Sequence, residues 1–167
     1  MAYWMTGFLS KTIMALKKLQ KLPLLAKTRL VGETALALQI GHRKSIDLDF
    51  FGELDFEIQE LIDSIKEFAD LTILSESKNI HIYSIDGIKV DFVNYKYPWI
   101  DDAICEDGIL LAGIKDIAAM KISAIIGRGT KKDFIDIAFL LQKFSLKDIL
   151  DFYSLKYNGR YYARYAD

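Results

Sequence analysis

Two aspartates one residue apart, Asp47 and Asp49, end the stretch from Leu30 to Phe51 and constrain the fold more than any other feature of the chain. In a β-strand this spacing puts both side chains on one face of the sheet. Two carboxylates held so close repel each other unless a cation compensates them. Gly32 and a short Ala/Leu-rich helix opening at Thr34 come before them. The stretch therefore predicts a strand, a glycine turn, a helix and a second strand, a layout typical of a site for phosphates and divalent metal.

The composition is that of a folded domain with segregated charges. The 167 residues are 51% hydrophobic and 13% aromatic, which excludes a disordered chain and allows one domain with a substantial core. The net charge of −1 gives no global argument for nucleic acid or membrane binding. However, charges are basic from Lys11 to Arg29, acidic from Asp47 to Glu76 and basic again from Lys115 to Lys132. This distribution can place a basic rim beside an acidic metal site.

Cysteine use and the N-terminus both indicate the cytoplasm. Cys105 is the only cysteine, which excludes an intramolecular disulfide framework and a Cys-based zinc site. Lysines interrupt the N-terminal hydrophobic residues too soon for a membrane span, and no signal-peptide pattern is evident. We therefore expect a reduced cytoplasmic protein that does not bind membranes.

Hydrophobic periodicity and turn residues predict the elements. Apolar residues at helical spacing predict a first helix from Leu9 to Ala26, ended or kinked by Pro23. The other predicted helices are 34–40, 56–69, 114–126, 130–144 and one from 145 onward. The predicted strands are 29–32, 45–51, 71–75, 79–85 and 88–95, the last two joined by the hairpin pair Asp86-Gly87. The tail 157–167 has no clear period, and its Tyr and Arg residues, like the basic first helix, are candidates for RNA contacts or for ordinary surface.

Two charged residues stand out within these elements. Asp91 interrupts the apolar pattern between Val90 and Phe92, and an aspartate in that position needs a partner. Lys121 falls within the apolar stripe of the helix 114–126, where it either snorkels to the surface or points its ammonium into a site. Neither His42 nor His81 has a second ligand at metal-binding spacing.

Four separated motifs together resemble one known family. They are Leu30-Val31-Gly32, Thr34-Ala35-Leu36, Arg43-x-Ser45-x-Asp47-x-Asp49 and the segment 121–141, KISAIIGRGTKKDFIDIAFLL. In this order they resemble the AbiEii/AbiGii-type toxins, a branch of the polymerase-β-like nucleotidyltransferase superfamily. The resemblance covers most of the chain, from residue 30 to residue 141.

The resemblance implies a fold, a reaction and partners. The expected fold is α/β: a nucleotidyltransferase-like mixed sheet flanked by helices, with a helical C-terminal part. The chain is expected to be a single domain, 1–167, with an N-terminal helix and catalytic sheet core at 1–112 and the helical part at 113–167. The expected activity is transfer of a nucleotidyl group from an NTP to an RNA, tRNA included, or to a protein hydroxyl, using Mg²⁺ or Mn²⁺. A cognate antitoxin protein is the expected partner in a toxin–antitoxin or abortive-infection system.

The resemblance also assigns roles to residues. The metal ligands would be Asp47, Asp49 and Asp91, which with Lys121 and Asp136 make up the expected catalytic set. Lys121 would neutralise triphosphate charge, and Asp136 would orient that lysine or act as a base. The expected substrate-binding residues are Gly32, Glu33, Thr34, Arg43, Ser45 and Arg128. Asp133 is expected to cap the helix that begins at Thr130.

Glu33 departs from the family pattern, which usually has a small residue there. A carboxylate beside a triphosphate adds repulsion and bulk where close backbone approach is wanted. Glu33 could turn away, act as an extra polar ligand, or mark a weakened enzyme. Two other hypotheses therefore remain: a degenerate nucleotidyltransferase that binds nucleotide or a partner without turnover, and a subunit that serves mainly in a toxin–antitoxin assembly.

Overall fold

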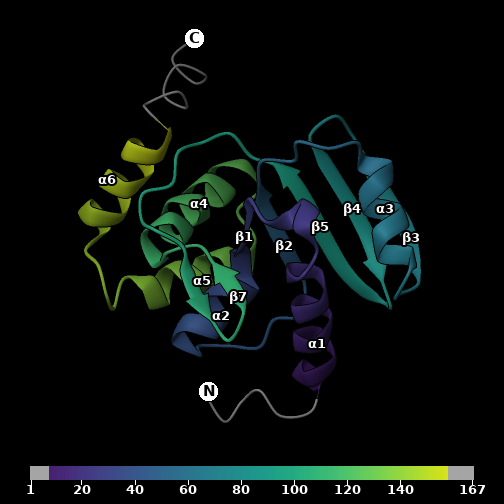
Figure 1. Ribbon diagram of the computed structural model, residues 1–167. Helices are drawn as coiled ribbons and strands as arrows, with labels where there is room; N and C mark the ends of the chain where they lie inside the picture. Colours follow the sequence, from purple (N-terminus) through teal and green to yellow (C-terminus); the bar gives the residue numbers. More distant parts are fainter. Residues whose placement is uncertain (1–7, 158–167) are drawn as a thin grey trace. The chain divides into compact units, whose positions relative to one another are not determined.

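The computed structural model describes residues 8–157, and in this range the chain forms two compact units. The first unit contains residues 8–96 and 104–111, and the second contains residues 97–103 and 112–157. The first holds the strands of the sheet, three α-helices and a short 3₁₀ helix, and the second contains the remaining helices (Figure 1).

The first unit is built on a mixed sheet. Within the described residues this sheet has seven strands in the order β3-β4-β5-β2-β1-β7-β6. They are β1 (Thr28–Val31), β2 (Leu48–Gly52), β3 (Leu71–Glu76), β4 (Ile80–Ile85), β5 (Ile88–Asn94), β6 (Ile104–Glu106) and β7 (Ile109–Leu111). β2 pairs in parallel with β5 and antiparallel with β1, so these three strands form the centre of the sheet.

Alternation along the central strands separates a core face from a half-buried face. Phe50 of β2 and Phe92 of β5 are fully buried, and their rings stack with centroids 5.5 Å apart. The residues between the buried ones, Asp49 and Asp91 among them, point to the opposite face and are half-buried. The core of this unit therefore forms on one face of the sheet, while the central carboxylates stand on the other.

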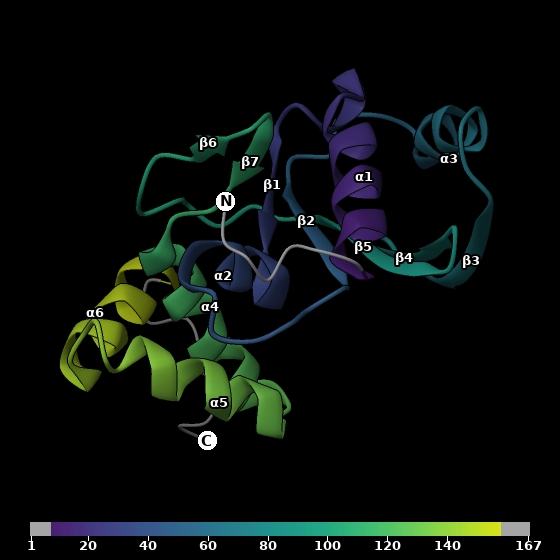
Figure 2. The same ribbon diagram turned by 90° about the horizontal axis from the view of Figure 1, so that it is seen from below.

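Helices α1 (Phe8–Gln20) and α3 (Ile58–Lys66) lie on one face of the sheet (Figures 1 and 2). Leu16 and Leu19 of α1 and Leu61 and Ile65 of α3 are fully buried, as expected for the apolar stripes of amphipathic helices. Pro23 opens the short 3₁₀ turn η2 (Pro23–Leu25), so the first helix ends before it. Helix α2 (Gly32–Ile40) follows β1 directly and ends at Gly41, which adopts the left-handed conformation of a C-cap.

The second unit consists of α4 (Ile114–Gly127), α5 (Lys131–Leu140), α6 (Leu146–Tyr157) and the segment 97–103. A fully buried ion pair links three of these parts: Lys156 of α6 lies with Nζ 2.7 Å from Asp116 Oδ1 of α4. Asp116 also accepts hydrogen bonds from the backbone N–H groups of residues 100 and 101. Lys156 donates to the carbonyl of Pro98 and lies 4.3 Å from the ring centroid of Trp99.

The predicted α/β architecture with a helical C-terminal part is confirmed, but two details differ. The strand predicted at 45–51 begins only at Leu48, and its antiparallel partner β1 ends at Val31, opposite Asp49, where helix α2 begins. The β6–β7 hairpin was not predicted. Its turn, Asp107-Gly108, has the same residue types and positive φ angles as the predicted turn Asp86-Gly87, and this signal could have identified it.

The predicted tail, 157–167, lies outside the described residues except for Tyr157, which ends α6. Among the helices of the described range, none has the length and hydrophobicity needed to cross a membrane.

Candidate active site

Asp49 and Asp91 lie side by side on the half-buried face of the sheet. They are register partners in the parallel pair β2–β5, and neighbouring strands bring such partners close together. Asp47 stands one residue before β2, outside the strand. The sequence spacing identified Asp47 and Asp49, whereas the position of Asp91 beside Asp49 depends on the order of the strands.

These carboxylates carry more negative charge than their surroundings neutralise. Burial, together with the charges of Asp91, Asp47 and Glu33, raises the pKa of Asp49 to about 7 against the opposing effect of Lys89. Lys89 donates from Nζ to Asp91 Oδ1 at 2.9 Å. Burial lowers the pKa of Lys89, but its hydrogen bond and charge interaction with Asp91 outweigh burial and raise it. The arrangement therefore favours a bound cation.

Gly32 makes room for the Asp49 carboxylate. Its φ angle of +72° is in the left-handed region, and a Cβ at this position would lie 2.4 Å from Asp49 Oδ2. Gly32 is also the first residue of α2, and the N-cap before it is Val31, whose side chain has no acceptor for the first N–H groups of the helix. Only glycine allows both the turn and the close approach of the carboxylate to the start of α2.

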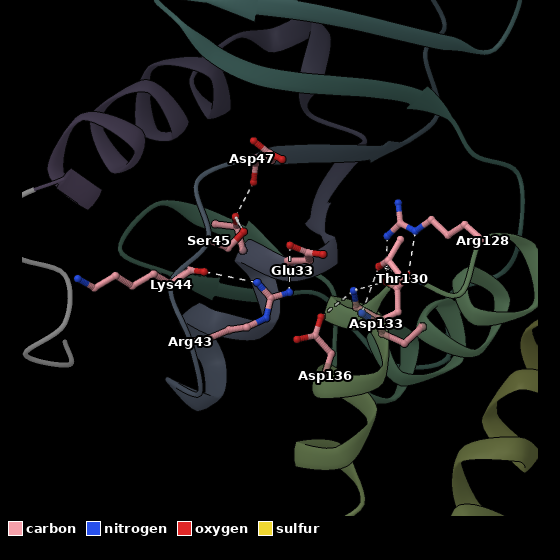
Figure 3. A network of polar contacts seen from close by, with 11 residues as sticks. Glu33, Arg43, Lys44, Ser45, Asp47, Arg128, Thr130, Asp133 and Asp136 are labelled. Carbon is pink, nitrogen blue, oxygen red and sulfur yellow. Dashed lines mark hydrogen bonds and ion pairs between the residues drawn. The ribbon is translucent and has the colours of Figure 1, made fainter.

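Glu33 forms an ion pair with Arg43 in this unit (Figure 3). Arg43 Nη2 lies 3.0 Å from Glu33 Oε2, and the two side chains are only 16% and 17% exposed. The guanidinium thus compensates the unusual carboxylate locally, although the charge of Glu33 still contributes to the raised pKa of Asp49. The sequence singled out both residues but did not indicate that they pair.

Thr34 ties the segment before β2 to helix α2. Its hydroxyl donates to the backbone carbonyl of Asp47, and its Oγ1 lies 2.9 Å from Ser45 Oγ. Thr34 and Ser45 are both buried. Of the expected site residues, the first unit therefore brings together Gly32, Glu33, Thr34, Arg43, Ser45, Asp47, Asp49 and Asp91.

In the second unit, Lys121 is buried between two aspartates of α5. Its Nζ lies 2.7 Å from Asp136 Oδ2 and 3.2 Å from Asp133 Oδ1, and its side chain is 4% exposed. The ammonium does not snorkel to the surface, although the sequence left that alternative open. The contact with Asp136 is the geometry required for Asp136 to orient the lysine.

Asp133 anchors the start of α5. It forms a capping box with Thr130, as predicted from the T-x-x-D spacing, and also accepts hydrogen bonds from Arg128 Nε at 3.0 Å and Nη2 at 2.9 Å (Figure 3). Burial acts to raise the pKa of Asp133, but the hydrogen bonds from Arg128 and Thr130 and the charge of Lys121 outweigh it and hold this pKa well below its usual range. Arg128, expected to bind substrate, is thus held by Asp133.

The residues present suit a hard divalent cation, with one reservation imposed by Lys89. Asp49 and Asp91, with Asp47 nearby, offer the carboxylate oxygens that Mg²⁺ and Mn²⁺ prefer. In the range 8–157 no three His, Cys, Asp or Glu side chains are already arranged as a metal site. In this structure Asp91 Oδ1 accepts a hydrogen bond from the ammonium of Lys89. Sequence reasoning missed Lys89, but the spacing Lys89-x-Asp91 on a strand puts both side chains on one face and could have identified it.

Solved structures with the same architecture define the class of fold. JHP933 from Helicobacter pylori is 22% identical, with a TM-score of 0.61 over 89% of this chain and 77% of that one. Another solved structure, of an H. pylori protein described as a candidate nucleotidyltransferase, is 24% identical, with a TM-score of 0.62 over 89% of this chain and 79% of that one. The antibiotic-resistance factor ANT(2'')-Ia is 13% identical, with a TM-score of 0.66 over 93% and 92% of the two chains. The fold is that of the nucleotidyltransferases.

Sequence similarity places the chain in a particular family. The protein aq_aa25 of Aquifex aeolicus (strain VF5), named as uncharacterized, is 39% identical over 151 residues, which cover 87% of this chain and 73% of the relative. The chain belongs to the family of aq_aa25. No family model matches the sequence.

Proposed function

We propose that this protein is a metal-dependent nucleotidyltransferase that transfers a nucleotidyl group from an NTP to a hydroxyl of RNA, tRNA included, or of a protein. The observation that carries this proposal is the pair Asp49 and Asp91, opposed on the central parallel strands of a nucleotidyltransferase-like sheet. The excess negative charge that raises the pKa of Asp49 supports a cation site there. The H. pylori protein described as a candidate nucleotidyltransferase supports the same class of reaction.

The proposed reaction is a displacement at the α-phosphorus of the NTP. The acceptor hydroxyl oxygen forms a bond to the α-phosphorus and loses its proton, while the bond from the α-phosphorus to the bridging oxygen of the β-phosphate breaks. Pyrophosphate leaves with the electron pair of that bond. A bound Mg²⁺ or Mn²⁺ would stabilise charge on the triphosphate and favour loss of the hydroxyl proton.

In this proposal Asp47, Asp49 and Asp91 hold the metal ion. The N–H groups at the start of α2, next to Gly32, suit phosphate oxygens because helix N-termini bind anions. Ser45 and Thr34 hold the segment leading into β2, and Arg43 adds a guanidinium close to that helix start.

The resemblance to the AbiEii/AbiGii-type toxins assigns Lys121 to the triphosphate and Asp136 to the orientation of Lys121. The 2.7 Å contact between Nζ and Oδ2 supports the role of Asp136. Arg128 would contribute positive charge while Asp133 holds its guanidinium.

The same resemblance motivates a biological role as the toxin of a toxin–antitoxin or abortive-infection system, with a cognate antitoxin as partner. Expression in a bacterial host should then arrest growth, and Asp49→Asn should relieve the arrest. Co-expression of the neighbouring gene should do the same. Normal growth of the host at high levels of the intact protein would contradict the toxin role.

Labelling with radioactive NTPs tests the activity. The full chain, incubated with each α-³²P NTP, Mg²⁺ or Mn²⁺ and total RNA, should label an RNA species or a protein, and EDTA should abolish the label. Asp49→Asn, Asp91→Asn and Lys121→Ala should each reduce labelling by at least about 100-fold, because transition-state charge loses its stabilisation.

Asp148→Asn is the matched control, since this carboxylate is exposed and caps helix α6 through Ser145. It should label as the parent does. Equal labelling by the parent and Asp49→Asn would show that the assignment is wrong.

The alternative function is a nucleotide-binding module without turnover. The observation in its favour is Glu33, whose charge adds to the negative field at Asp49. The ion pair with Arg43 argues for an active enzyme instead, because it compensates the carboxylate.

Calorimetry and labelling of Glu33→Gly and Glu33→Gln separate the two functions. If the enzyme is active, neither variant gains activity over the parent. If NTP and Mg²⁺ bind to the parent but only Glu33→Gly transfers the nucleotide, the binding-module alternative is correct.

A further inference from the structure

Lys89 is the basic side chain that shares the half-buried face of β5 with Asp91. The two residues are one apart on the strand, so their side chains point the same way, and Lys89 Nζ lies 2.9 Å from Asp91 Oδ1. Asp91 is the register partner of Asp49 on β2. The ammonium is thus already bound to one carboxylate of the proposed metal site.

The two partners of this ion pair differ in exposure. The Asp91 side chain is 18% exposed, whereas the Lys89 side chain is 45% exposed. Because the Lys89 side chain is long and half-exposed, its ammonium can move from Asp91 into water at small cost. Asp91 is largely covered and lies beside Asp49, so the loss of the Lys89 ammonium would favour the binding of another cation in its place. The pair is therefore suited to exchange one cation for another.

We propose that Lys89 is a tethered cation that occupies Asp91 when no metal is bound and is displaced when a divalent cation binds, so that Lys89 sets the affinity of the site for metal. This inference rests on the proposed function, because it takes Asp49 and Asp91 as metal ligands. It goes beyond that function by assigning a role to a residue that would touch neither the nucleotide nor the metal.

Competition of this kind lowers the apparent affinity for metal. When only a fraction of molecules has a free carboxylate, the apparent Kd is the intrinsic Kd divided by that fraction. A divalent ion still wins at sufficient concentration, because it carries twice the charge and binds several oxygen ligands at once. Replacing Lys89 by an uncharged residue should therefore increase the affinity for metal and lower the stability of the metal-free protein.

Mn²⁺ titration followed by the electron paramagnetic resonance signal of free Mn²⁺ tests the inference without any assay of activity. Lys89→Gln should bind Mn²⁺ about tenfold more tightly than the parent if the ammonium occupies Asp91 in about nine molecules of ten. Lys89→Arg keeps the cation and should bind as the parent does. In thermal denaturation with EDTA, Lys89→Gln should have a lower Tm than the parent, and Mn²⁺ should raise the Tm of Lys89→Gln by more.

Lys27→Gln is the matched control for the loss of one positive charge. Lys27 belongs to the same unit and pairs with two carboxylates, Glu53 at 3.2 Å and Asp55 at 2.8 Å, which lie outside the proposed metal site. This variant should leave the affinity for Mn²⁺ unchanged. If Lys27→Gln and Lys89→Gln increased the affinity for Mn²⁺ equally, the effect would come from net charge alone, and the inference would be overturned.

Failure of the inference differs from failure of the proposed function. If Asp49→Asn weakens Mn²⁺ binding but Lys89→Gln binds no tighter than the parent, the metal site stands and the role of Lys89 is wrong. If Asp49→Asn binds Mn²⁺ as tightly as the parent, or if neither the parent nor Lys89→Gln binds Mn²⁺, the proposed metal site and the inference both fail.

Discussion

Asp49 shows how strongly neighbours change the chemistry of one residue. An aspartate in an unfolded chain has a pKa near 4, whereas burial, Asp91, Asp47 and Glu33 raise the pKa of Asp49 to about 7 in the folded protein. Between these two pH values the folded protein holds a proton that the unfolded chain has lost. The free energy of unfolding therefore falls as pH rises through this window.

Removing the Asp49 charge should remove this pH dependence. In EDTA, the stability of Asp49→Asn relative to the parent should increase from pH 4 to pH 7, with a slope of up to about 1.4 kcal/mol per pH unit. Urea unfolding of the parent and Asp49→Asn at a series of pH values measures this difference in stability. Asp55→Asn is the control of opposite sign. Hydrogen bonding to Lys27 lowers the pKa of Asp55, so the Asp55 carboxylate stabilises the folded protein at neutral pH and loses this effect only in acid. A relative stability of Asp49→Asn that does not change with pH would contradict the prediction.

Gly32 can be tested against a glycine with the same backbone conformation. Gly32 and Gly87 have φ angles of +72° and +81°, but a Cβ meets the Asp49 carboxylate only at Gly32 and meets nothing within 4 Å at Gly87. Gly87→Ala should cost about 1 kcal/mol for the left-handed backbone alone. Gly32→Ala should cost more and should also weaken Mn²⁺ binding, because Asp49 must move. Equal losses of Tm and unchanged Mn²⁺ binding would show that the close approach has no role.

At the level of elements, α5 and α6 begin with the same pattern but in different surroundings. Thr130-x-x-Asp133 and Ser145-x-x-Asp148 both form reciprocal caps, as the sequence predicts. Only Asp133 is buried, and it also binds Lys121 and Arg128. The spacing predicts the cap, but it gives no indication that one cap is also the centre of a charge network.

The two caps should therefore differ in their effect on stability. Asp133→Asn should reduce the free energy of unfolding by about 3 kcal/mol, since it leaves the buried ammonium of Lys121 with one carboxylate fewer. Asp148→Asn should have a much smaller effect, because solvent screens this exposed cap. Urea denaturation of both variants measures the difference, and similar losses would contradict a special role for Asp133.

At the scale of the whole molecule, the ion pair of Asp116 and Lys156 joins α4, α6 and the segment 97–103 within the second unit. Lys156→Met leaves the buried carboxylate of Asp116 with its two backbone donors but without the Lys156 ammonium. This substitution should reduce the free energy of unfolding by about 3–5 kcal/mol. The double variant Lys156→Met with Asp116→Asn should lose less than the sum of the two single variants.

Hydrogen exchange locates the effect of this substitution. In Lys156→Met, exchange should accelerate in 97–103 and 146–157 and remain as in the parent in strands β2 and β5, which belong to the other unit. Faster exchange throughout the sheet would contradict the assignment of this pair to the second unit. Whether the two units act as the single predicted domain stays a prediction.

The sequence by itself determined the local features: the strand, glycine turn and helix at residues 28–40, the Asp86-Gly87 hairpin and the two Asp caps. Backbone sterics and short-range hydrogen bonds produce these features within a few residues, so a local pattern is enough to predict them. The resemblance added the class of fold, which the structural neighbours confirm.

Only the tertiary structure decided which charges meet. Asp91 lies beside Asp49 because β5 pairs in parallel with β2, although the two residues are 42 positions apart in the chain. Lys89 then meets Asp91 on the same face, Arg43 meets Glu33, and Lys121 meets Asp133 and Asp136 instead of solvent. These pairings depend on strand order, register and burial, and each of these is set by the packing of the complete unit and not by neighbouring residues in the sequence.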